Sequence, residues 1–130
     1  YSQVFGVMMD INLFKKINDT YGHTVGDDAI RTAGKLLSGW VDVSDTVIRF
    51  AGDEFIIICV DRTEEDVVEL INDIRNKLVE YNRMRKKQYE LTFAMGYTQY
   101  LPSYTKLDEF LWEMDQKMYE DKEVFRKSFC

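Results

Sequence analysis

The stretch Arg49-Phe50-Ala51-Gly52-Asp53-Glu54-Phe55 decides how this chain folds. It lies between two short apolar runs rich in β-branched residues, residues 46–48 and 55–60, which predict two strands. Only residues 51–54 remain for the reversal between them, so we expect a tight β-hairpin. Asp53 and Glu54 place two adjacent carboxylates at its tip. Either they bind a cation, or Gly52-Asp53 is ordinary turn chemistry and Glu54 lies in solvent.

A further carboxylate ends the first predicted strand. Residues 4–10 form an apolar run that closes on Asp10, and α/β domains usually bind ligands at strand ends. If this strand lies beside the hairpin, Asp10 and Asp53 converge on one point. Their oxygens would form a site for a hard cation, suited to Mg²⁺ carrying phosphates. Such an ion polarises a phosphoryl oxygen and lowers the pKa of an attacking hydroxyl.

The remaining segments predict four helices and one more strand. Residues 13–18 form a short helix, and Thr24 resembles the start of a capping box that opens a helix ending near residue 37. One interpretation of Asp27 is then that it only accepts hydrogen bonds from the first amides of this helix. Thr63 begins a third helix, residues 89–99 form a strand, and residues 107–122 form the last helix. The order β-α-α-β-β-α-β-α predicts an α+β, ferredoxin-like fold, an antiparallel sheet with helices packed on one face.

The composition indicates one domain over residues 1–130. The 130 residues are 45% hydrophobic and 31% charged, which suits a single core without covalent staples. A net charge of −6 argues against nucleic-acid binding, although a metal and a few local cations can still hold a nucleotide. Cys59 and Cys130 make no disulfide framework, which fits a reducing compartment. We expect a cytoplasmic domain from a longer protein, whose regulatory or sensor domain and any membrane anchor lie outside these residues.

Four blocks of the chain together resemble the GGDEF domains, the diguanylate cyclase family. They are Asp10-x-x-x-Phe14-Lys15-x-x-Asn18-Asp19, Tyr21-Gly22-His23-x-x-Gly26-Asp27, the hairpin stretch at residues 49–55, and a looser Asp115-x-x-x-Tyr119-x-x-Lys122-x-x-x-Arg126. The resemblance covers nearly the whole chain and implies a fold related to nucleotide cyclases and polymerase palms. It also implies that two GTP condense to cyclic di-GMP and two pyrophosphates across an antiparallel dimer of GGDEF domains, each holding one GTP.

The same resemblance implies a metal site and a base. Asp10, the backbone carbonyl of Ile11 and Asp53 would bind Mg²⁺ or Mn²⁺, and Glu54 would be a further ligand or a neighbouring carboxylate. Asp53 or Glu54 would help to deprotonate the attacking hydroxyl, and the family usually assigns this role to the position of Asp53. A carboxylate linked to a metal is a poor base unless its pKa is raised, so the choice between the two stays open.

By the same resemblance, Asn18 and Asp27 would read the guanine base. Guanine offers its N1–H and its N2 amino group to a carboxylate, whereas adenine presents an acceptor at N1 that Asp27 would repel. Asp27 therefore favours GTP over ATP. His23, the only histidine, would lie near the base or merely pack locally.

The triphosphate would be held by amides and by two cations. The backbone amides of Phe14 and Lys15, at the start of the short helix, would cradle the β- and γ-phosphates, as helix N-termini can. Lys122 and Arg126 are four residues apart on the last helix and would reach the same phosphates. Otherwise they are a surface pair without a role.

The chain departs from the family at two places. Ala51 stands where the first glycine of the family motif lies, and its methyl group is strained at positive φ but nearly harmless at negative φ. The product-inhibition motif of the family, Arg-x-x-Asp, is replaced by Asp42-Val43-Ser44-Asp45. We expect no inhibitory site, because an acidic residue cannot clamp a phosphate.

Three functions fit these residues. The first is an active diguanylate cyclase. The second is a catalytically weak or inactive GGDEF domain that binds GTP and regulates an attached domain. The third is another nucleotidyl cyclase or palm-type transferase that shares only the metal carboxylates, against which Asn18 and Asp27 weigh.

Overall fold

The elements follow one another in the predicted order. In residues 3–104 and 106–128, which the computed structural model describes, they are β1 (Val4–Ile11), α1 (Phe14–Tyr21), α2 (His23–Trp40), β2 (Thr46–Ala51), β3 (Glu54–Val60), α3 (Glu64–Arg83), β4 (Phe93–Gln99) and α4 (Leu107–Lys127). The predicted hairpin is present and tight, since only Gly52 and Asp53 separate β2 from β3.

Strand β1 lies in the interior of the sheet. The strand order is β2-β3-β1-β4, and every neighbouring pair is antiparallel. The register pairs Asp10 with Glu54 of β3 and with Ala94 of β4. The end of β1 is therefore level with the tip of the β2–β3 hairpin, as the sequence predicts.

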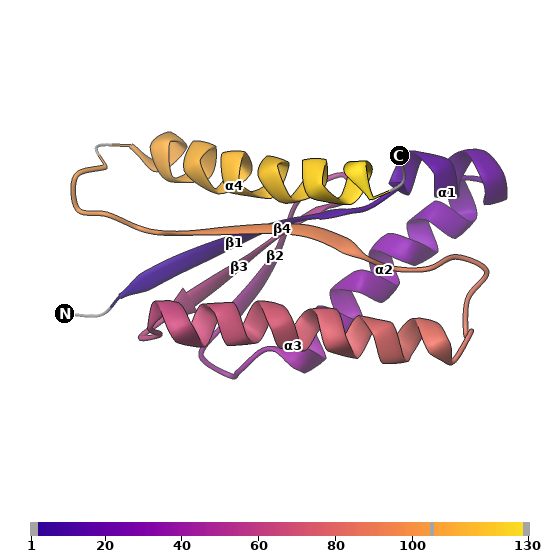
Figure 1. Ribbon diagram of the computed structural model, residues 1–130, viewed down its shortest axis with the longest axis horizontal. Helices are drawn as coiled ribbons and strands as arrows, with labels where there is room; N and C mark the ends of the chain where they lie inside the picture. Colours follow the sequence, from indigo (N-terminus) through magenta and orange to yellow (C-terminus); the bar gives the residue numbers. More distant parts are fainter. Residues whose placement is uncertain (1–2, 105, 129–130) are drawn as a thin grey trace.

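Helices cover both faces of the sheet, which corrects the expectation that they pack on one face. On one side, Met8, Ile56 and Ala94 pack against α4. On the other side, Val7 and Met9 belong to a larger core that includes α2 and α3 (Figure 1). The reason lies in β1, which is buried along nearly its whole length. Consecutive apolar side chains of a strand point to opposite faces, so both faces need cover.

The two predicted helix starts have different outcomes. Thr63 caps α3 with the full capping box, in which its hydroxyl accepts from the amide of Asp66 and the Asp66 carboxylate accepts from the amide of Thr63. The capping box predicted at Thr24 is wrong. Helix α2 begins at His23 behind Gly22, whose φ of 92° turns the chain directly out of α1, and no side chain caps it. Thr24 thus lies inside the first turn.

Several element ends differ from the prediction, and α2 for example continues to Trp40 rather than ending near residue 37. Strand β4 begins at Phe93 rather than Tyr89, because the Asn82 side chain bonds both the amide and the carbonyl of Leu91, at 2.9 Å each. These groups are thereby satisfied without a neighbouring strand. Helix α1 continues to Tyr21, and α4 continues to Lys127. The longer α4 includes Arg126, which the prediction needs on that helix.

Candidate functional site

The end of β1 and the tip of the hairpin meet. The amide of Ile11 donates a hydrogen bond to the carbonyl of Asp53, at 3.2 Å. Gly52 supplies the turn, with φ of 45°, and the guanidinium of Arg49 donates to its carbonyl at 3.0 Å. Asp10 is buried, and it shares a face of the sheet with Glu54. We call the three carboxylates Asp10, Asp53 and Glu54 the acidic site.

Each carboxylate of the hairpin tip is harder to ionise than usual. Burial, together with the Asp10 carboxylate nearby, raises the pKa of Asp53 to about 7. A protonated Asp53 can donate a hydrogen bond to Asp10, and the charge of Glu54 acts in the same direction. Burial and the charges of Asp10 and Asp115 also raise the pKa of Glu54, against the lowering effect of Lys122.

Lys122 reaches this cluster from α4. Its ammonium lies 2.7 Å from Oδ2 of Asp10. The hydrogen bond with Asp10, followed by the charges of Asp10, Asp53 and Glu54, raises the pKa of Lys122. One of the two cations predicted to hold phosphates therefore lies at the acidic site.

The other oxygen of Asp10 has no partner. Oδ1 is buried and accepts no hydrogen bond in the described part of the chain. Buried carboxylate oxygens are normally bonded or bound to a metal, so this atom fits a hard cation that the structure does not contain. The described residues hold no group of three or more His, Cys, Asp or Glu side chains arranged for a metal. The predicted ligand set of Asp10, Asp53 and the Ile11 carbonyl supplies only two such side chains, and its third oxygen is backbone.

The predicted guanine-reading residues lie around the junction of α1 and α2. Asn18 is on α1, and its side-chain amide rests on Gly26 of α2 so closely that a side chain at Gly26 would overlap it. Asp27 is the next residue of α2. Asp27 and His23 are both exposed to solvent. The structure therefore brings Asn18 next to the start of α2, where Asp27 and His23 lie.

The predicted phosphate-binding groups are only partly brought together. Phe14 and Lys15 form the first turn of α1, behind Leu13 with φ of 57°, and no side chain caps this helix. Amides of a first turn lack partners within their helix. Arg126 lies one turn beyond Lys122 on α4, and its guanidinium bonds Glu123 at 2.9 Å.

Asp115 has no predicted role, although it begins the last of the four stretches that resemble the GGDEF domains. Its charge acts on Glu54 from α4. Asp115 and Lys122 are seven residues apart, a spacing that places two residues on the same face of a helix. From this spacing the sequence could have indicated that Asp115 faces the same site as Lys122.

The two departures from the family motifs have simple structural consequences. Ala51 is not among the described residues with positive φ, so its methyl group strains no backbone. In the replaced inhibitory motif, the Asp45 side chain is fully buried and accepts two bonds from Arg62, at 3.0 and 3.2 Å. Asp42 also lies near Arg62, at 3.5 Å. The Asp45 carboxylate is therefore occupied within the fold.

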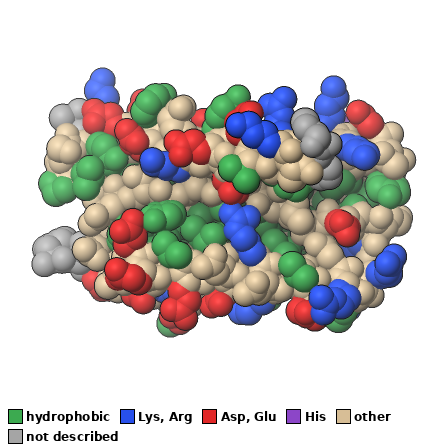
Figure 2. All heavy atoms as spheres, in the orientation of Figure 1, with side chains coloured by type: hydrophobic (Ala, Val, Ile, Leu, Met, Phe, Trp, Pro, Cys, Tyr) green, Lys and Arg blue, Asp and Glu red, His purple; other side chains and the backbone are tan. Residues whose placement is uncertain are grey.

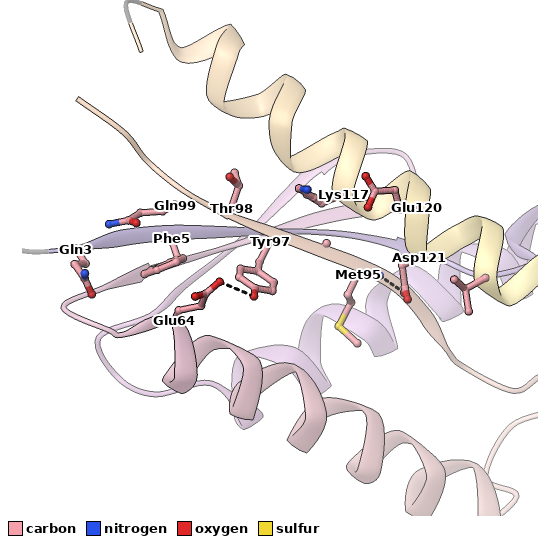
Figure 3. Close-up of a pocket in the computed structure, with 12 residues that line it drawn as sticks. Gln3, Phe5, Glu64, Met95, Tyr97, Thr98, Gln99, Lys117, Glu120 and Asp121 are labelled. Carbon is pink, nitrogen blue, oxygen red and sulfur yellow. Dashed lines mark hydrogen bonds between the residues drawn. The ribbon is translucent and has the colours of Figure 1, made fainter. Parts of the chain in front are cut away.

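A cavity along β4 lies away from the acidic site. It has a volume of about 660 Å³ and follows the outer edge of β4 between α3 and α4 (Figure 3). Tyr97 donates to Glu64 across it, and Asp121 accepts from the amide of Met95. Figure 2 shows the same face of the molecule, with acidic and basic side chains interspersed. None of the predicted site residues lines this cavity.

No helix within residues 3–104 and 106–128 combines the length and the apolar character that a membrane crossing requires.

Known proteins resemble the chain over almost all of its length. A profile of the family described as "Diguanylate cyclase, GGDEF domain" matches residues 1–128. Diguanylate cyclase DgcZ of Escherichia coli is 32% identical over an alignment of 124 residues that covers 92% of this chain and 40% of that protein. Diguanylate cyclase A of Treponema denticola is 29% identical over 118 residues, 90% of this chain and 32% of that protein. The chain thus spans less than half the length of either relative.

The fold agrees with that of solved GGDEF domains. The GGDEF domain of DgcB from Caulobacter crescentus, solved in complex with c-di-GMP, aligns with a TM-score of 0.84 at 23% identity. The alignment covers 95% of this chain and 74% of that one.

Proposed function

Because the chain belongs to the GGDEF domain family of diguanylate cyclases, we propose that it condenses two GTP into cyclic di-GMP with release of two pyrophosphates. The observation that supports this most is the meeting of Asp10 and Asp53 at the end of β1, with one buried oxygen of Asp10 left without a partner. A buried carboxylate oxygen without a hydrogen-bond partner is costly, and a binding site for a cation beside it explains why Oδ1 of Asp10 is there.

Asp10, Asp53 and the backbone carbonyl of Ile11 would hold Mg²⁺ or Mn²⁺. When bound, the ion would neutralise phosphate charge and make the attacking 3′-hydroxyl more acidic. The proton of that hydroxyl passes to Asp53 or Glu54. In the metal-free domain both have a raised pKa, which favours either as a base over an ordinary carboxylate, whereas a bound ion would lower the pKa of a carboxylate that it contacts.

The remaining residues bind and orient the substrate. Asn18 and Asp27 bond the Watson–Crick edge of guanine, whose donors suit a carboxylate, and His23 lies close to the base. The amides of Phe14 and Lys15 hold phosphate oxygens at the start of α1.

Two cations complete the phosphate site. Lys122 and Arg126 neutralise the triphosphate from α4. Most of the catalytic effect then comes from positioning and charge neutralisation.

One chain forms half of the reaction centre. In the proposed antiparallel dimer, the 3′-hydroxyl of each GTP attacks the α-phosphate of the other. A site of this kind is open until the partner closes it. We propose that the domain works in the cytoplasm and that a regulatory or sensor domain of the parent protein controls the pairing.

The test is incubation with GTP and Mg²⁺, with the chain fused to a dimeric coiled coil so that pairing is enforced. Separation of the nucleotides by chromatography should show cyclic di-GMP and pyrophosphate. The variant Asp10→Asn in the same fusion should give neither. Bound but unreacted GTP would indicate the non-catalytic, regulatory GGDEF domain instead, and another product would indicate a different transferase.

A further inference from the structure

Lys122 supplies the counter-charge for the Asp10 carboxylate, because strand β1 carries no cation of its own. The side chain of Asp10 is only 9% exposed, whereas that of Lys122 is 40% exposed. Their 2.7 Å contact joins α4 to the end of β1, across 112 residues of sequence. The lysine therefore brings a positive charge from the surface into the position beside Asp10.

This position is also where the metal would bind. A divalent cation held by Asp10 and Asp53 would compete with the ammonium for the oxygens of Asp10, and the two positive charges would repel each other. Removing the lysine without the metal would leave a nearly buried carboxylate uncompensated, which is strongly unfavourable. One cation must replace the other.

Lys122 is able to move away. A lysine ammonium is a compact charge on a flexible four-carbon stem, and the exposure of this side chain leaves space around it. Arg126 is one turn further along α4, and it is the second cation that the proposed function assigns to the triphosphate.

We propose that Lys122 is a placeholder cation, which occupies Asp10 in the nucleotide-free domain and leaves it for the triphosphate when the metal and the nucleotide bind. The identity of the nucleotide rests on the proposed function above. Metal alone must displace the lysine without giving it a new partner, and nucleotide alone must withdraw it from Asp10. When both ligands bind, the metal replaces Lys122 at Asp10 and the triphosphate becomes the new partner of Lys122. Each ligand therefore strengthens the binding of the other, by the same factor in either direction.

The first test uses Mn²⁺ alone, measured by the electron paramagnetic resonance signal of the free ion during titration of the nucleotide-free domain. We expect Lys122→Met to bind Mn²⁺ about tenfold more tightly than the unmodified chain, because no resident cation has to be displaced. Lys117→Met is the matched control, because it removes a cation from the same helix, one that lines the cavity along β4 and has no role in the proposed site. Its affinity should stay within about twofold of the unmodified chain, which is below the roughly fivefold or larger change expected for a coupled site.

Lys122→Gln serves as a second variant, and thermal unfolding shows that each variant is folded. Equal or weaker Mn²⁺ binding by both folded Lys122 variants would overturn the proposal. Absence of measurable binding by every protein would also overturn it.

The second test uses a GTP analogue with a methylene group between the α- and β-phosphorus atoms, which cannot release pyrophosphate. In EDTA, Asp10→Asn should bind this analogue more tightly than the unmodified chain, because Lys122 is no longer held by the carboxylate. In a Lys122→Met background the same change should have a smaller effect, since only the repulsion between Asp10 and phosphate is then removed. Equal effects in the two backgrounds would contradict the exchange.

The two tests separate this inference from the proposed function. The Mn²⁺ titration involves no nucleotide and no turnover. A chain that makes no cyclic di-GMP could still show the lysine effect, and an active cyclase could lack it.

Discussion

The amide of Ile11 bonds the carbonyl of Asp53 at 3.2 Å, and this bond ties the end of the central strand to the tip of the hairpin. The side chains of Asp10 and Asp53 meet as a consequence. The electrostatics of the acidic site and its expected chemistry follow from this single juncture.

Replacement of Asp10 by Asn should abolish the cyclase reaction. The variant keeps the size of the side chain but removes one of two carboxylates from the proposed metal site. We expect turnover to fall by about a hundredfold or more, which corresponds to about 2.7 kcal/mol of transition-state stabilisation. The measurement is the rate of pyrophosphate release by the enforced dimer. Turnover within a few-fold of the unmodified chain would exclude Asp10 as a metal ligand.

The stability of the metal-free domain should fall as the pH rises through the range in which Asp53 of the acidic site loses its proton. The pKa of Asp53 is about 7 in the folded chain, against 3.8 for an ordinary carboxyl. Between these pH values the folded state holds a proton that the unfolded state has lost, so the free energy of unfolding decreases with rising pH. The measurement is the urea midpoint at several pH values, and Asp53→Asn should flatten the dependence over this window.

Mg²⁺ should reverse that loss. The ion binds the deprotonated carboxylates, so protons compete with it at low pH. The rise in Tm on addition of Mg²⁺ should therefore be larger at pH 8 than at pH 5. A rise that does not depend on pH would show that Mg²⁺ binds elsewhere.

Replacement of Gly26 by Ala should weaken GTP binding without unfolding the domain. The new methyl group overlaps the Asn18 amide, which must turn away from its present position. We expect the Kd for GTP to rise about tenfold, equal to about 1.4 kcal/mol. Calorimetric titration of the methylene analogue measures the effect.

Gly34→Ala is the matched control, because it adds a methyl group to the same helix at an ordinary distance of 3.6 Å from Phe55. Alanine favours a helix interior over glycine by up to about 1 kcal/mol, so this variant should be stabilised and should bind GTP unchanged. Equal affinities of the two variants for the analogue would show that Asn18 does not contribute to binding of the base.

Replacement of Asp121 by Ala should destabilise the outer edge of the sheet. Its carboxylate accepts from the amide of Met95 on β4, at 2.8 Å, and pairs with Arg75 at 3.0 Å. Loss of this acceptor should lower the free energy of unfolding by about 1–3 kcal/mol. Glu80→Ala removes an exposed ion pair on α3 and should cost about 0.5 kcal/mol or less. Equal losses in chemical denaturation would show that Asp121 does not protect the edge.

Cyclic di-GMP, the proposed product, should not inhibit the cyclase reaction by binding at the altered motif of residues 42–45. Asp42 carries the wrong charge for a phosphate, and Asp45 is buried against Arg62. Calorimetric titration of cyclic di-GMP should show no site of nanomolar to low-micromolar affinity there. Such a site, if lost on Arg62→Ala, would show that Arg62 replaces the missing arginine.

The sequence by itself determined the order of the elements, the hairpin and the carboxylate at the end of the first strand. These features are local: strand runs, turn residues and the Thr63 capping box act between residues a few positions apart. The convergence of Asp10 and Asp53 could also be predicted, because a hairpin beside a buried strand has few possible registers. The prediction failed at Thr24, since Gly22 already ends the preceding turn with a positive φ.

Only the tertiary structure decided which distant side chains meet. Helix α4 covers the face of the sheet opposite to α2 and α3, and this placement brings Lys122 to Asp10. The fold also brings Arg62 to Asp45 and Asn82 to Leu91, and it leaves a cavity of about 660 Å³ along β4. Such contacts depend on how whole faces pack, because the residues concerned are far apart in the chain and no local pattern relates them. The acidic pair can be read from the sequence, whereas its resident counter-ion follows from the packing of α4.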